Sequence, residues 1–229
     1  AGGTELSTND ERKLGELVMR DHRTFGAVTE DPDITAYITR LGGRIASAAG
    51  QSPSSFEFFL VADKSINAFA MPGGYILLSS GLLKTLESED ELAFILAHEV
   101  AHVSRRHHYQ VVQRQRLADQ AAKGLQAVTQ DSDTAKLAQA SGQIYARGLD
   151  KGAEFESDRL GVEYMTRAGY DPVAAINVLE KLQRFKGNDP RAELLFSTHP
   201  SPAERLDMLL QSGIDKGLEI IRKMTGSVR

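Results

Sequence analysis

Residues 98–102 read His98-Glu99-Val100-Ala101-His102, an H-E-x-x-H sequence set in a strongly apolar segment of the chain. The capping pattern and apolar periodicity that precede it predict a helix. Residues four apart lie on one helical face, so the two imidazoles can reach a single metal ion. Glu99 lies about 100° around the helix from His98. It therefore borders the ion without being a ligand, where its carboxylate can accept a proton from a water that zinc acidifies.

A catalytic zinc site usually has three protein ligands, and two candidates exist for the third. One is His108, which falls at the last histidine of the H-E-x-x-H-x-x-G-x-x-H pattern. However, Arg105 replaces the glycine of that pattern, so we expect the helix to continue. His108 would then lie about 9 Å along the axis beyond His102. We expect His107 and His108 to be exposed on a basic stretch.

The other candidate lies in the segment Glu154-Phe155-Glu156-Ser157-Asp158. Glu154 and Asp158 share one face of a predicted helix, so Glu154 can bind the ion while Asp158 orients a histidine or pairs with a cation. Glu156 lies on another side of this helix and is expected to be solvated.

The composition excludes several classes of protein. There are no cysteines, so disulfides, a thiol nucleophile and thiolate metal sites are excluded. The net charge of −4, from 27 basic and 31 acidic residues, offers no basic surface for nucleic acid. No apolar run approaches the roughly 20 residues of a membrane span. The chain begins at Ala1 rather than methionine, which suggests a removed upstream segment through which the protein could associate with a membrane.

The expected fold is α+β and helix-rich, a zincin-like (gluzincin) domain with a small sheet packed on the metal helix. We expect a single domain over residues 1–229. N-terminal helices would occupy residues 8–50, with the first over 8–26, and three strands over 56–79 would form an antiparallel meander. Metal-site helices would lie within 88–168 and C-terminal helices within 172–224, and the stretch 124–151 has the weakest pattern.

Four segments in matching order resemble the HtpX and CAAX-prenyl-protease type of zinc metallopeptidase. They are the H-E-x-x-H motif, the segment 154–158, the stretch 67–74 (NAFAMPGG) and the late stretch 197–205 (STHPSPAER). The resemblance implies one zinc ion per chain, with His98, His102 and Glu154 as its ligands. It also implies that His199 stabilises the oxyanion or occupies the metal in a resting state, and that Arg205 pairs with Asp158.

In lacking spanning helices, the chain resembles the exported members of that family, which act in quality control of envelope proteins. The resemblance therefore implies a periplasmic location. A protease holds its substrate extended, so the strand containing Asn67, Ala68, Phe69 and Ala70 is expected to bind a peptide as an added strand. An ordinary interior strand is the alternative.

The leading hypothesis is a zinc-dependent endopeptidase that acts on protein or peptide substrates, with Glu99 and His199 as its catalytic residues. A deformylase-type hydrolase shares the H-E-x-x-H motif but needs a cysteine ligand that this chain lacks. The third hypothesis is a non-catalytic or latent binding module in which the metal braces the helices and His199 closes the fourth position.

Overall fold

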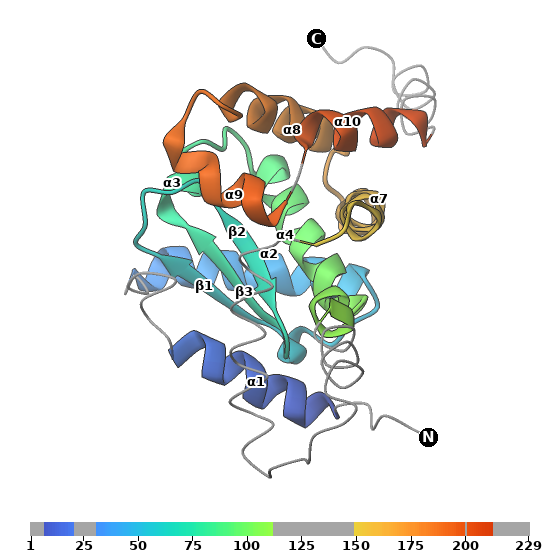
Figure 1. Cartoon of the computed structure of the whole chain (residues 1–229). Helices are drawn as coiled ribbons and strands as arrows, with labels where there is room; N and C mark the ends of the chain where they lie inside the picture. Colours follow the sequence, from blue (N-terminus) through green and yellow to red (C-terminus); the bar gives the residue numbers. More distant parts are fainter. Residues whose placement is uncertain (1–6, 21–30, 112–148, 200, 213–229) are drawn as a thin grey trace, which may run out of the picture.

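A three-stranded sheet enclosed by helices forms the centre of the molecule (Figure 1). The computed structural model describes residues 7–20, 31–111, 149–199 and 201–212. The helices are α1 (Thr8–Arg20), α2 (Pro32–Ala48), α3 (Ser80–Leu83), α4 (Glu89–Ser104), α7 (Lys151–Arg167), α8 (Val173–Phe185), α9 (Glu193–Thr198) and α10 (Pro202–Gln211); the strands are β1 (Glu57–Val61), β2 (Ala68–Met71) and β3 (Tyr75–Ser79). Short 3-10 turns occupy Pro53–Ser55 and Pro190–Ala192. The helix-rich α+β class expected from the sequence is confirmed.

Helices α2, α4 and α10 begin where the capping residues predict. Asp31 accepts hydrogen bonds from two amides at the start of α2, and Ser88 and Ser201 each accept one, at the start of α4 and of α10. The short helices α3 and α9 escaped prediction because one or two turns carry too little periodicity. Residues 21–26 of the first predicted helix, most of the stretch 124–151 and the predicted terminal helix after 213 lie outside the described residues.

The sheet is mixed, so the expected antiparallel meander is wrong. The strand order is β1-β3-β2, in which β3 is central and pairs parallel to β1 and antiparallel to β2. Residues 62–67 therefore do not form a hairpin turn between neighbouring strands. They pass across the end of β3 and deliver the chain to its far side.

Hydrogen bonds at the end of β3 explain this crossing. The Gly81 amide donates to the Asp63 carbonyl (2.8 Å). The Ser79 hydroxyl donates to the Ser65 carbonyl (2.6 Å) and accepts from the Asn67 amide (3.0 Å). A side chain at Gly81 would collide with the Ser65 and Lys64 carbonyl oxygens. The turn residues predicted between β1 and β2 are thus held over β3 by groups that follow it.

The two faces of the sheet pack against different helices. Side chains of Phe58, Ala68 and Ile76 point into the main core with α2 and α4. The alternate residues Phe69, Met71 and Leu77 form a smaller cluster on the opposite face, where α1 lies (Figure 1). All of β2 and β3 is buried, and the outer position of β2 places it beside α4.

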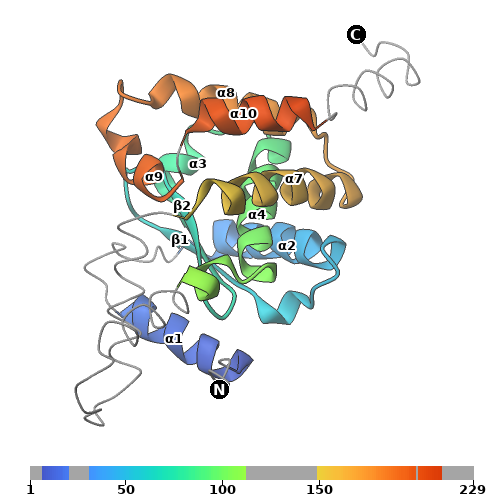
Figure 2. The ribbon, with the colours of Figure 1, turned by 45° about the vertical axis from the view of Figure 1, so that its right-hand side comes forward.

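The C-terminal helices cover α4 from the other side. Figure 2 shows α7 against α4, with α8 and α10 side by side above them. Lys181 of α8 joins the start of α4 by ion pairing with Glu91 (2.8 Å) and donating to the Thr85 carbonyl (2.9 Å). Among the described helices, none combines the length and apolarity that crossing a bilayer demands.

Gly74 provides a test of the packing between the β2–β3 turn and residues 53–56. Its φ of +91° disfavours any side chain, and a Cβ there would lie 1.9 Å from the Ser55 carbonyl oxygen. Gly50 has a φ of +72° with no atom near its Cβ position, so it serves as a matched control. We expect Gly50→Ala to lower the free energy of unfolding by about 1 to 2 kcal/mol. Gly74→Ala should lower it by a further ~1 to 3 kcal/mol. Urea unfolding of both variants measures the difference, and equal losses would contradict the described contact.

Candidate metal centre

Helix α4 presents two imidazoles from a fully buried position. His98 and His102 lie one turn apart, and every residue of α4 from Glu91 to His102 is buried. Helix α7 approaches very closely because it has Gly161 at the contact. A Cβ at Gly161 would lie only 3.2 Å from the backbone nitrogen of His98. This approach brings the acidic face of α7 to the imidazoles.

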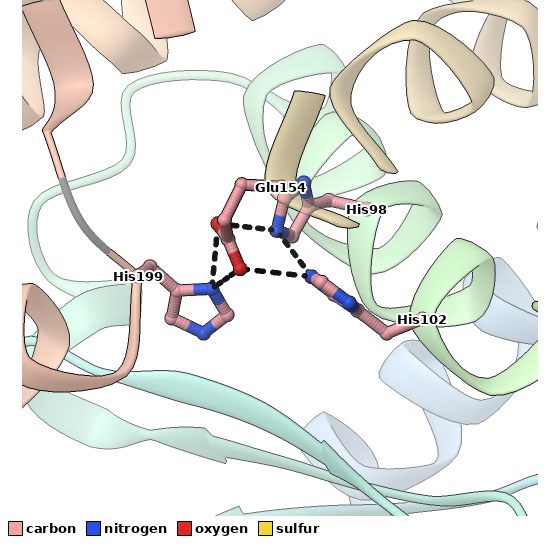
Figure 3. Close-up of side chains that lie close together, drawn as sticks. All are labelled: His98, His102, Glu154 and His199. Carbon is pink, nitrogen blue, oxygen red and sulfur yellow. Dashed lines mark hydrogen bonds and ion pairs between the residues drawn. The ribbon is translucent and has the colours of Figure 1, made fainter. Parts of the chain in front are cut away.

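Four side chains converge at this contact, and Figure 3 shows them pointing toward one another. They are His98 and His102 of α4, Glu154 of α7 and His199, which follows α9. One ligand atom from each lies within 4.8 Å of all the others. Glu154 Oε2 is 3.6 Å from His98 Nε2, and Glu154 Oε1 is 3.4 Å from His102 Nε2. Imidazole nitrogens and a carboxylate converging at this distance fit a divalent cation such as zinc.

A second buried acid–base group lies behind His98. Asp158 accepts two hydrogen bonds from Arg205, at 2.8 and 2.6 Å, and lies 3.0 Å from His98 Nδ1. Arg205 Nη1 also lies 3.3 Å from Glu154 Oε2. Burial opposes ionisation of Asp158, but the Arg205 guanidinium prevails and lowers the pKa of the Asp158 carboxyl. The pairing expected between Arg205 and Asp158 is present in the structure.

The ionisable groups of the cluster shift one another's pKa values. Burial and Arg205 act to lower the pKa of His98, yet hydrogen bonds to Asp158 and Glu154 raise it to about 9. Burial would raise the pKa of Glu154, but His199 and His98 hold it well below its usual range. The pKa of His102 is lowered by burial and by His98. The positive charge of protonated His98 thus balances the negative charge of Glu154, as a bound cation would.

Glu99 lies beside the cluster without joining it. Its side chain is buried, its Oε2 atom has no hydrogen-bond partner among the described residues, and burial raises the pKa of its carboxyl. Glu99 Oε1 is 3.8 Å from His199 Nε2. Glu99, His98 and His199 line a small cavity of about 20 Å³, enough for a single water.

His199 connects the cluster to the sheet. Its Nδ1 lies 3.1 Å from both carboxylate oxygens of Glu154, and its Nε2 lies 3.2 Å from the Ala68 carbonyl oxygen on β2. The other residues predicted to bind substrate do not contact His199 in this way. Phe69 faces the α1 side, Ala70 faces the main core, and Asn67 is tied to Ser79 through its backbone.

The turn after α4 differs from the expectation. The helix ends at Ser104, and Arg106 adopts a left-handed φ of 55° although it is not glycine. Glu11 of α1 pairs with the Arg106 guanidinium at this turn. The helix breaks at Arg105 and Arg106, and helical backbone resumes over residues 107–111, so the expected continuous helix past Arg105 is wrong. His107 and His108, predicted to be exposed, are both buried.

Sequence reasoning therefore missed the groups around His107. Its Nδ1 lies 3.0 Å from His102 Nδ1, and its Nε2 lies 3.2 Å from Glu156 Oε2. Glu156, expected to be solvated, is only partly exposed and also pairs with Arg105. Burial lowers the pKa of His107 despite this carboxylate. The sequence did contain a signal, because His107 and His108 follow His102 by only five and six residues. A turn between them, which here forms at Arg106 without a glycine, can bring such histidines back to the metal site.

A buried H-E-x-x-H helix that meets a glutamate of a later helix defines a zincin-like metallopeptidase fold of the glutamate-ligand type. The sequence profile of peptidase family M48 matches residues 32–212, and the chain belongs to this family. A beta-barrel assembly-enhancing protease from Yersinia pestis is 36% identical in an alignment 218 residues long that covers 90% of this chain and 44% of that protein. Its namesake from Escherichia coli K12 is 33% identical with the same coverage.

A mitochondrial metalloendopeptidase OMA1 from Schizosaccharomyces pombe is 32% identical over 180 residues, covering 75% of this chain and 51% of that protein. The chain thus spans about half the length, or less, of these relatives. The resemblance to the HtpX and CAAX-prenyl-protease type is confirmed only at the level of the wider family, which implies a metal. The relatives named above are of other kinds.

Arg205 allows a test of the buried ion pair. Arg205→Met would leave Asp158 buried without its cation, so we expect the metal-free protein to lose about 3 to 5 kcal/mol of unfolding free energy. Arg159→Met is the matched control, because Arg159 is exposed and its pair with Glu163 is worth at most about 1 kcal/mol. Urea unfolding with chelator present compares them, and similar losses would show that the Arg205–Asp158 pair does not stabilise the fold.

Proposed function

We propose that this chain is a zinc-dependent endopeptidase that hydrolyses peptide bonds of protein substrates. His98, His102 and Glu154 would hold one zinc ion per chain. The observation that carries the proposal is the convergence of these three donors from two buried helices, with Glu99 beside them and not among them. A catalytic site needs this separation between ligands and base.

The residues around the cluster have distinct roles in this reaction. A bound divalent cation supplies Lewis acidity, which polarises the scissile carbonyl and lowers the pKa of water. Glu99 takes the proton from the attacking water and passes it to the leaving amine. Its buried carboxyl has a raised pKa, which suits a group that must hold a proton between two steps. His199 stabilises the oxyanion, and Arg205 with Asp158 holds His98 in place.

The substrate would bind extended along β2, as an added strand. The outer position of β2 in the described sheet and the 3.2 Å contact between His199 and the Ala68 carbonyl support this site. Ala68, which lines the cavity beside Glu99 and His199, offers a small side chain there. We further propose that the substrates are misfolded or envelope proteins and that the protein is periplasmic. The name of two relatives, beta-barrel assembly-enhancing protease, supports this proposal.

A second candidate function is a latent or non-catalytic module whose metal braces the helices. The contacts of His199 with both oxygens of Glu154 favour it, since His199 in that place can close a fourth ligand position. A structural site is closed, whereas a catalytic site keeps one position open.

Glu99→Gln tests the assigned base. The variant should bind one zinc per chain, because Glu99 is not a ligand, and should lose at least about 100-fold in cleavage of casein. His98→Ala, His102→Ala and Glu154→Ala should lose zinc as well. Metal analysis and a casein digest measure both properties.

Glu87→Gln is the control for this substitution, since Glu87 lies just before α4 with its side chain 81% exposed. It should cleave casein at the wild-type rate. Normal cleavage by folded, zinc-loaded Glu99→Gln protein would eliminate the mechanism.

Removal of the metal separates the two candidate functions. If the site is catalytic, a chelator should abolish cleavage while the far-UV circular dichroism spectrum stays unchanged, because α4 and α7 are held by their apolar contacts as well. Added zinc should then restore activity. Loss of helical signal with chelator, in a protein that never cleaves casein, would favour the bracing module instead.

A further inference from the structure

His102 has a second nitrogen that faces away from the cluster, and this nitrogen has a buried partner. While His102 Nε2 points toward Glu154 and His98, its Nδ1 lies 3.0 Å from Nδ1 of His107. Both imidazoles are buried, His102 completely. A contact between two ring nitrogens at this distance is a hydrogen bond, in which one ring donates and the other accepts.

The chain of hydrogen bonds extends from His107 to a partly exposed carboxylate. His107 Nε2 lies 3.2 Å from Glu156 Oε2, on the helix that carries Glu154. Arg105 holds the other oxygen of this carboxylate, at 2.7 Å. A carboxylate only accepts hydrogen bonds, so His107 must carry its proton on Nε2.

This requirement sets the direction of the whole chain of hydrogen bonds. With its proton on Nε2, neutral His107 has only a lone pair at Nδ1, so it accepts there. His102 must then donate from Nδ1, which leaves the lone pair of His102 on Nε2. That atom is the one facing Glu154.

We propose that His107, oriented by Glu156, is a positioning residue that fixes His102 in the tautomer able to bind metal through Nε2. The inference rests on the proposed metal site and adds a residue outside its ligand set. His98 has a simpler arrangement, since its Nδ1 lies directly against the Asp158 carboxylate. The two ligand histidines thus have different partners, one a buried acid and the other a second imidazole that reaches a partly exposed acid.

The turn after α4 is what makes this arrangement possible. In a continuous helix, His107 would lie about 140° around the axis from His102 and about 7.5 Å farther along it. The left-handed Arg106 breaks the helix and changes its course, and the ring centroids of His102 and His107 come to 5.1 Å, edge to face.

Ser157 also approaches His107, with its hydroxyl 3.3 Å from Nδ1. Serine, histidine and glutamate together resemble a nucleophilic triad. However, Ser157 is completely buried, and His107 Nδ1 already receives the bond from His102. Ser157 therefore belongs to the polar surroundings of His107 and is not placed to attack a substrate.

A pair of nearly isosteric substitutions tests the role of His107. In His107→Asn the side-chain oxygen can replace Nδ1 as acceptor, whereas His107→Leu has the same size and no acceptor. We expect His107→Leu to bind zinc about 10- to 100-fold more weakly than wild type, and His107→Asn to retain most of the affinity. Competition with a chromophoric zinc chelator measures the affinity. A role in packing alone predicts the opposite order, because leucine suits a buried site better than asparagine.

Equal zinc affinity of wild type and His107→Leu would overturn the proposal, as would equal weakening by both substitutions in folded protein. Nitrogen-15 spectra of the zinc-loaded wild type provide a test that needs no variant. A proton on Nε2 of His107 supports the arrangement, and a proton on its Nδ1 refutes it. Failure of the wild-type protein to bind zinc at all would instead refute the metal site itself.

Discussion

The close contact of α7 with α4 is the constraint on which the rest of the site depends. A Cβ at Gly161 would lie only 3.2 Å from the backbone nitrogen of His98. This close approach brings Glu154 and Asp158 of α7 onto the part of α4 that is buried from Glu91 to His102. Buried charges must be compensated. Each of these acids therefore has a basic partner within about 4 Å: Glu154 has the imidazoles and Arg205, and Asp158 has Arg205.

Much of this site could be predicted from the sequence because its residues follow the helical period. Two histidines four apart must share a face, and the same rule joins Glu154 to Asp158 on α7. The apolar residues around the H-E-x-x-H motif fit the burial of α4 from Glu91 to His102. What no local rule can provide is the distance between α4 and α7. That distance follows from how the two helices pack. Only the family resemblance indicated that Glu154 lies close to His98 and His102.

The errors arose where a local signal has more than one tertiary outcome. Turn residues at 63–65 mark a change of direction but do not say which strand the chain reaches, and here it passes across β3. The lack of glycine after His102 suggested a continuous helix, since a left-handed residue with a side chain is uncommon. In the structure Arg106 adopts that conformation, with Glu11 from a distant helix at its guanidinium. The burial of His107 and His108 follows from that break in the helix.

The strand order also has a consequence for synthesis of the protein. Strands β1 and β2 pair only with β3 in the described sheet, yet both precede it in the chain. While the polypeptide emerges from the ribosome, two short, largely apolar strands must wait for their shared neighbour. Unpaired strands of this kind invite association with other chains. The nascent polypeptide therefore exposes two unpaired strand edges until residues 75–79 become available.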